Sequence, residues 1–239
     1  MPLIAAYHRP VSVDEALSQL TDARRKPLGG GTVINADREK SDLEVVDLQA
    51  LGLSGIEPAA GKLRIGATTS LAEITDSPHV PETLRELSRR DQPASVRSVA
   101  TIGGTIASRE PDSTLLAALL VHDAQVEFAG ADDRPLVSVL AAGVPAGSII
   151  TAVVIDPSGV TTVEATGRTP ADTPIVAAVA RSAESGTTVA LTGVAATPVL
   201  VSVDDPTSGL EPPGDFRGSP DYRRHLASTL STRALGAIR

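Results

Sequence analysis

The residues best suited to binding chemistry lie in two glycine-rich segments about 70 residues apart, at 27–32 and 100–105, and both end in Gly-Gly-Thr. Because glycine has no side chain, several backbone N–H groups and one hydroxyl can approach a phosphate or a flat ring. A Gly-Gly pair also serves ordinary turns that need a positive φ. The repetition of the motif favours a cofactor held between the two segments.

Neither segment has the spacing of a P-loop or of a Rossmann loop. No Gly-Lys-Ser or Gly-Lys-Thr follows the first segment, and its three adjacent glycines do not form Gly-x-Gly-x-x-Gly. The sequence therefore predicts a cofactor cradle of another kind.

The side chains that most often catalyse reactions indicate no further site. The chain has no cysteine, which excludes disulfides, thiolate nucleophiles, cysteine-bound zinc and iron–sulfur clusters within it. No serine lies in a Gly-x-Ser-x-Gly elbow, and no histidine has a second histidine or a cysteine at i+3 or i+4. The histidines are His8, His79, His122 and His225. We therefore predict no metal and no catalytic side chain, so redox chemistry would need a bound organic cofactor.

Charge and composition limit the partners. The net charge is −8 and the basic residues are dispersed, so nucleic-acid binding is not expected. No run approaches the roughly 18 apolar residues of a membrane span, and the first residues lack a signal-peptide pattern, so we expect a soluble, cytoplasmic protein. Carboxylates near the glycine segments are expected to be solvated turn residues: Asp37, Glu39, Glu110 and Asp112.

With two tyrosines, two phenylalanines and no tryptophan, few residues can stack on a ring.

Apolar spacing, caps and turn residues predict an α+β fold. Helices are expected at 13–23, 71–74, 81–87, 114–121, 173–182 and 219–235. Strands are expected at 44–48, 62–67, 125–128, 149–155, 160–165, 189–194 and 199–203. A Pro-Ser-Gly break at 157–159 divides the chain into predicted domains of residues 1–157 and 158–239.

The order of several short motifs resembles a known family. Tyr-His-Arg-Pro at 7–10 precedes the first glycine segment, and Val-Val-Asp-Leu at 45–48 and Leu-Arg-Ile-Gly-Ala-Thr-Thr at 63–69 follow it. The second segment belongs to Val-Arg-Ser-Val-Ala-Thr-Ile-Gly-Gly-Thr at 96–105, and Gly-Ser-Pro-Asp-Tyr-Arg-Arg-His-Leu-Ala stands at 218–227. Over nearly its whole length the chain resembles the FAD-binding medium subunit of the molybdenum hydroxylases, the carbon monoxide dehydrogenase and xanthine dehydrogenase family.

The resemblance implies a two-lobed, PCMH-type FAD-binding domain followed by a small α+β C-terminal flavoprotein domain. It implies a flavin-dependent oxidoreductase subunit that passes electrons from the 2Fe-2S clusters of a small subunit through FAD to an acceptor. A large subunit with the molybdenum cofactor would oxidise the substrate, and the three subunits would form a heterotrimer or its dimer. The flavin would supply the redox chemistry, so no side chain of this subunit need act as an acid or base.

The residues that the resemblance assigns to FAD come mainly from the two glycine segments. They are Leu28, Gly29, Gly30, Gly31, Thr32, Val33 and Ile34 from the first, Thr101, Ile102, Gly103, Gly104 and Thr105 from the second, and Ser108, Thr114 and Ile150 elsewhere.

Three departures from the family pattern weaken the expected site. The second segment ends in Thr105, where the family usually has asparagine. Thr114 stands where the family's Pro-x-Ser-Asp segment has an aspartate that contacts the cofactor, unless Asp112 replaces it. The stretch between Ile150 and Gly167 lacks the aromatic residue and the lysine usual there. Two alternatives therefore stay open: a non-redox paralogue that serves assembly or regulation, with weak or no FAD binding, and a flavoprotein of another complex.

Overall fold

Short helices and short strands make up the chain, for which the computed structural model describes residues 4–36, 42–167 and 172–238. The helices are α1 Val13–Gln19, α2 Leu71–Asp76, α3 Glu82–Asp91, α4 Ala94–Arg97, α5 Ile102–Ser108, α6 Thr114–Val121, α7 Leu136–Ala142 and α8 Pro220–Ala237, with 3-10 turns at Ile34–Ala36 and Gln49–Leu51. The strands are β1 Ala6–His8, β2 Arg25–Leu28, β3 Glu44–Asp47, β4 Ile56–Ala59, β5 Lys62–Gly66, β6 Gln125–Ala129, β7 Arg134–Pro135, β8 Ile149–Ile155, β9 Val160–Thr166, β10 Val176–Ala183, β11 Gly186–Thr192 and β12 Val199–Val201.

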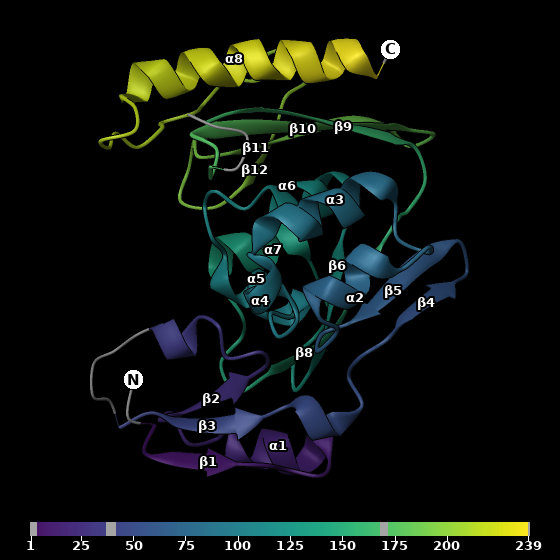
Figure 1. The fold of residues 1–239 in the computed structure, drawn as a ribbon, viewed down its shortest axis with the longest axis vertical. Helices are drawn as coiled ribbons and strands as arrows, with labels where there is room; N and C mark the ends of the chain where they lie inside the picture. The colour runs from purple at the N-terminus through teal and green to yellow at the C-terminus, as the bar shows by residue number, and fades with distance from the viewer. Residues whose placement is uncertain (1–3, 37–41, 168–171, 239) are drawn as a thin grey trace.

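Within the described residues these strands form three sheets that follow one another along the long axis of the molecule (Figure 1). The N-terminal sheet is parallel, in the order β1-β3-β2. The central sheet, β4-β5-β8-β6-β7, and the C-terminal sheet, β12-β11-β10-β9, are antiparallel. In Figure 1, α8 covers the outer face of the C-terminal sheet, and α6 lies beneath its inner face. The α+β prediction is confirmed.

Serine caps begin several helices where the sequence predicts them. Ser12 caps α1, and Ser70 forms a reciprocal capping box with Glu73 at the start of α2. At the start of α6, Oγ of Ser113 accepts a hydrogen bond from the N–H of Leu116 at 3.2 Å. Every residue of α6 after the first is buried, which confirms the buried helix predicted at 114–121.

The helix predicted at 173–182 is wrong, because this segment is strand β10. Its alanine-rich sequence has high helix propensity, but Val176 to Ala180 are all buried between two layers. Val179 packs in the core shared with α6, whereas Ala178 and Ala180 pack in the core shared with α8. Small side chains alternating between two covered faces thus favour a central strand, and tertiary packing overrides propensity.

The other predicted helices and strands are present with bounds shifted by a few residues. Elements that were not predicted are β1, β2, β4, β7, α4, α5 and α7, all of them seven residues or fewer. Among the described helices, none combines the length and the apolar run that a membrane crossing requires.

A buried polar cluster joins α6 to the C-terminal sheet. Arg181 on β10 is 2% exposed, and its guanidinium forms an ion pair with Asp156 at 2.6 Å. The same guanidinium donates to the carbonyl oxygens of Ser158 at 2.9 Å and Val121 at 3.0 Å. His122 is fully buried and donates from Nδ1 to the carbonyl oxygen of Asp156 at 2.6 Å, and burial lowers the pKa of its imidazole. The cluster therefore fixes the loop between β8 and β9 to both α6 and β10.

Candidate functional site

The two glycine segments are brought together as walls of a cavity of about 580 Å³. The cavity lies between the N-terminal lobe, with β2 and β3, and the end of the central part that carries α5 and the start of β8. Its lining consists of residues 26–27, 29–34, 48, 67–68, 101, 103–104, 107–109, 142–144, 148 and 150. Segments far apart in the sequence therefore line one cavity.

The first glycine segment leaves β2 with free backbone donors. Within the described residues, no hydrogen bond uses the N–H groups of residues 29–32. Gly31 has a φ of +72°, a left-handed conformation that disfavours side chains. The segment therefore presents a run of amide donors to any ligand that can accept hydrogen bonds.

Close packing against the second segment explains two of these glycines. A Cβ atom on Gly30 would lie 1.7 Å from the carbonyl oxygen of Val99, and one on Gly29 would lie 2.8 Å from Oγ1 of Thr101. A side chain at either position would push the two segments apart. Gly29 and Gly30 therefore set the distance between the walls, in addition to keeping the backbone accessible.

A hydrogen-bond network behind the first segment holds it in place. The hydroxyl of Tyr7 donates to the buried carboxylate of Asp47, and this bond is the main cause of the raised pKa of the Tyr7 phenol. Asp47 also accepts from the N–H of Gln49 at 2.9 Å, and Nε2 of Gln49 donates to the carbonyl oxygen of Gly29 at 3.2 Å. The Tyr and Asp of the Tyr-His-Arg-Pro and Val-Val-Asp-Leu motifs thus support the glycine segment from one side.

The second glycine segment differs, because its amides are already used. The N–H of Gly103 donates to the carbonyl oxygen of Ala67 at 2.9 Å, and the N–H of Gly104 donates to Oγ1 of Thr101 at 3.2 Å. A Cβ atom on Gly103 would lie 2.8 Å from the same Ala67 oxygen. This segment is the capped first turn of α5, and it serves as a rigid wall more than as a set of free donors.

The charge of the lining is positive. Lys26 and Arg109 are the ionisable residues among those that line the cavity, and no ion pair between described residues includes either of them. Asp37 and Glu39, predicted as solvated turn residues, lie outside the described residues. Arg109 ends α5 in a left-handed conformation with φ +52°, and its Nη1 donates to the carbonyl oxygen of Leu140 at 3.2 Å. An uncompensated positive charge beside free amide donors favours an anionic ligand. In the part of the chain that the structure describes, no group of His, Asp and Glu side chains could hold a metal ion.

Of the fifteen residues assigned to FAD from the sequence, eleven line this cavity. They are Gly29, Gly30, Gly31, Thr32, Val33, Ile34, Thr101, Gly103, Gly104, Ser108 and Ile150. Leu28, Ile102, Thr105 and Thr114 are not part of the lining, and Ile102 is a core residue. Asp112 does not line the cavity either, because its carboxylate accepts from Nη2 of Arg217 at 2.5 Å.

Several lining residues escaped the sequence analysis. Arg109 stands directly after Ser108, so its nearness to a predicted contact was the available signal. Residues 142–144 and Ser148 reach the cavity because α7 ends and β8 begins there. No local pattern marks them, since only the pairing of β8 with β5 and β6 places that loop opposite the glycine segments.

None of the lining residues is aromatic. Tyr7 is bound to Asp47, Phe128 packs against the central core, and Phe216 is 95% exposed. The apolar part of the lining is aliphatic, with Ile34 and Ile150 among its members. A ring bound here would pack on methyl groups instead of stacking on an aromatic face.

The fold and the site define a cofactor-binding domain for an anionic ligand held between two glycine-rich walls. Residues 3–155 match the family described as the FAD binding domain in molybdopterin dehydrogenase, and the chain belongs to that family. The predicted resemblance, the oxidoreductase class and FAD as the family's cofactor are therefore confirmed.

The chain is also similar to individual proteins and to solved structures. It is 31% identical to the uncharacterized protein YgfM of Escherichia coli K12, over 95% of this chain and 94% of that protein. It is 31% identical to the xanthine dehydrogenase FAD-binding subunit of Escherichia coli O157:H7, over 52% of this chain and 46% of that subunit. Its fold matches a chain of the carbon monoxide dehydrogenase from Hydrogenophaga pseudoflava with a TM-score of 0.89 at 23% identity, covering 100% of this chain and 98% of the other.

The residues present fit FAD. Its diphosphate has acceptor oxygens for the free amides of residues 29–32 and negative charge that complements Lys26 and Arg109. The glycines leave space that a Cβ atom would fill, and the aliphatic lining suits the apolar faces of rings. The fit is weakest where a stacking partner would stand.

Proposed function

We propose that this chain is the FAD-carrying electron-transfer subunit of a molybdenum-hydroxylase-type complex. In this proposal a large subunit with a molybdenum cofactor oxidises the substrate, and a small subunit with 2Fe-2S clusters delivers the electrons to this subunit. The observation that carries the proposal is the cavity itself, in which the described residues contribute free amides, two cations and no carboxylate around a space lined by both glycine segments.

The residues of the chain have separable tasks in this function. The N–H groups of residues 29–32 would donate hydrogen bonds to the diphosphate, and Gln49 holds this segment in place by donating from Nε2 to the carbonyl oxygen of Gly29. Thr101 fixes the first turn of α5, which closes the opposite wall. Ile150 and the other aliphatic lining residues would exclude water from the rings of the cofactor. When bound, FAD supplies one- and two-electron transfer, and the protein supplies position and electrostatics.

The remaining parts of the proposal concern the residues outside the cavity lining, the division into domains and the location of the complex. We place Leu28, Ile102 and Thr105 as supports of residues that touch the ligand, and Thr114 outside the contact set. We divide the chain near residue 157 into an FAD-binding domain and a C-terminal domain that packs on it through α6. We also place the complex in the cytoplasm, where its partners would be assembled.

A flavin titration tests the proposal. The protein is purified, its absorption spectrum is recorded, and the flavin-free form is titrated with FAD by calorimetry. We expect a flavin spectrum or stoichiometric uptake of one FAD, followed by bleaching of the bound flavin with dithionite. A colourless protein that gives no heat with FAD would refute the proposal.

A second function is favoured by one observation, the absence of any aromatic residue from the lining. A paralogue that assembles or regulates a complex without redox chemistry would have no need of a stacking partner. Such a protein would pair with the large and small subunits but fail the FAD titration. Co-purification alone does not separate the two functions, because both versions could assemble.

A further inference from the structure

We propose that Arg109 is a cofactor-binding residue whose guanidinium pairs with the negatively charged diphosphate of FAD. This inference rests on the proposed function, because it takes FAD to be the ligand of the cavity. It concerns a residue outside the glycine motifs, at a position where neither the sequence pattern nor the resemblance assigned a contact.

The backbone at Arg109 is the first reason. Arg109 follows the last residue of α5 with φ +52° and ψ +36°, the left-handed conformation that usually belongs to glycine at a helix end. A side chain makes this conformation less favourable, and such outliers collect at functional sites. An arginine in this conformation therefore indicates a function of its side chain, since glycine would suit the backbone better.

The surroundings of the guanidinium are the second reason. Nη1 donates to the carbonyl oxygen of Leu140 at 3.2 Å, which ties α5 to the end of α7 and fixes the side chain along the cavity wall. Gly143, with φ +86°, has no side chain, and the position of its Cβ would lie 3.6 Å from Cζ of Arg109. The guanidinium is thus held in place while the space beside it stays open.

The unused hydrogen-bonding capacity is the third reason. A guanidinium has five N–H donors in a planar fork, and the described residues use one of them at Arg109. Among the residues that the structure describes, no carboxylate lines the cavity to neutralise the charge. A planar fork with free donors matches two oxygens of a phosphate group in a bidentate arrangement.

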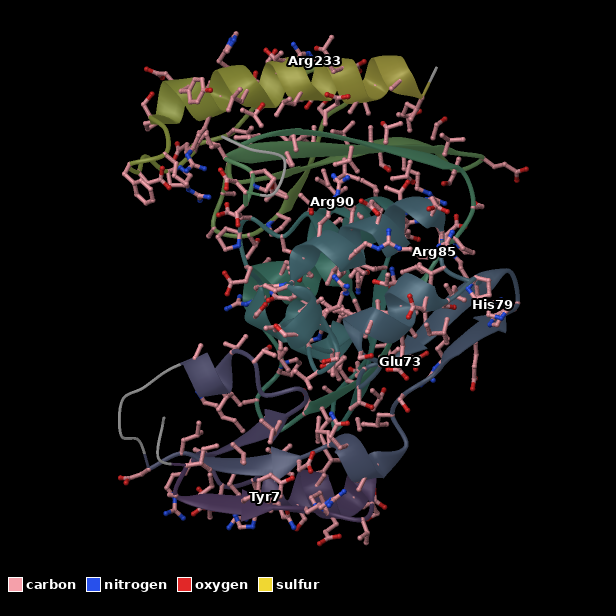
Figure 2. All side chains as sticks on the ribbon, in the orientation of Figure 1. Tyr7, Glu73, His79, Arg85, Arg90 and Arg233 are labelled. Carbon is pink, nitrogen blue, oxygen red and sulfur yellow. The ribbon has the colours of Figure 1, made fainter. Side chains whose placement is uncertain are left out.

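Binding measurements on three variants test the inference. Arg109→Gln removes the charge, Arg109→Lys keeps it without the fork, and Arg109→Gly also relieves the left-handed backbone. Arg233→Gln is the matched control, because Arg233 is an exposed arginine on α8, far from the N-terminal lobe (Figure 2). Each flavin-free protein is titrated with FAD and with riboflavin, which has no phosphate, at low and high ionic strength, and thermal denaturation checks its folding.

We expect Arg109→Gln and Arg109→Gly to weaken FAD binding about 10- to 100-fold, the range of one charge-assisted hydrogen-bonded contact. Arg109→Lys should lose less, Arg233→Gln should bind as the wild type does, and the loss should shrink at high ionic strength because salt screens the contact. Riboflavin binding should not change. Where riboflavin binds too weakly to measure, the salt dependence of the loss in FAD affinity decides whether Arg109 contacts the diphosphate.

Three outcomes overturn the inference. Unchanged FAD affinity in Arg109→Gln and Arg109→Gly, with normal wild-type binding, refutes it and leaves the proposed function standing. An equal loss for riboflavin, or a loss that salt does not reduce, assigns Arg109 to the ring or to the wall instead of the diphosphate. A wild-type protein that binds no FAD refutes the proposed function and this inference together.

Discussion

Replacing Gly30 by alanine tests whether the two glycine segments set the width of the cavity. The added Cβ would lie 1.7 Å from the carbonyl oxygen of Val99 and 2.5 Å from its carbonyl carbon, whereas real Cβ contacts essentially never fall below 3.0 Å. The oxygen and the Cβ must therefore separate by at least the 1.3 Å between 3.0 and 1.7 Å. Gly30 does not have a positive φ, so the effect comes from space alone.

The expected cost follows from this overlap. Overpacking of a tight contact destabilises a protein by about 1–3 kcal/mol. At about 2–4 °C per kcal/mol for a chain of this size, the Tm of Gly30→Ala should fall by about 2–12 °C. FAD affinity should fall about tenfold or more, because the amides of residues 29–32 move away from their partner by a distance that breaks at least one charge-assisted bond.

Calorimetric melting and FAD titration of the same preparations measure both effects. Gly236→Ala is the control, since this α8 glycine has no atom within 4 Å of the added Cβ, and its Tm should stay the same or rise slightly. A Gly30→Ala protein with the melting temperature and FAD affinity of the wild type would refute the contact between the segments. A lower Tm with unchanged affinity would show that the spacing serves the fold and not the ligand.

Three further predictions concern α5 and the polar cluster at the C-terminal sheet. Thr101→Ala removes the hydroxyl that accepts the N–H of Gly104 and should lower the free energy of unfolding in urea by about 1 kcal/mol, while Thr101→Ser should retain it. Arg181→Met leaves the Asp156 carboxylate without its 2.6 Å partner and should lower the free energy of unfolding by about 3 kcal/mol in the same assay. A loss below about 1 kcal/mol would contradict a stabilising role of the buried polar cluster. Burial lowers the pKa of His122 in the folded state, so protons bind preferentially to the unfolded chain and the free energy of unfolding should fall as pH drops through about 6.5. Urea titrations between about pH 7 and 5 should show a flatter profile for His122→Gln, and parallel profiles for the two proteins would contradict this assignment.

The elements that the sequence predicts well are those whose signals are local. Ser113 caps α6 and an uninterrupted apolar run follows, so both the start and the burial of this helix can be read from adjacent residues. β8 matches its predicted bounds at 149–155 for the same reason, because a short apolar run suits a central strand. The short elements α4, α5 and α7 have no such pattern, since packing against neighbours stabilises them.

The sequence by itself determined the α+β class, the family, the two glycine segments and half of the residues that line the cavity, because these follow from residue types and their order along the chain. Only the tertiary structure decided that β10 is a strand, because its alanines are covered on two faces by α6 and α8. It also decided that the first segment has free amides while those of the second are satisfied, and that Arg109 faces the cavity. Whether a donor is used and which charge is left unpaired depend on atoms contributed by distant parts of the chain, and the fold alone brings those atoms together.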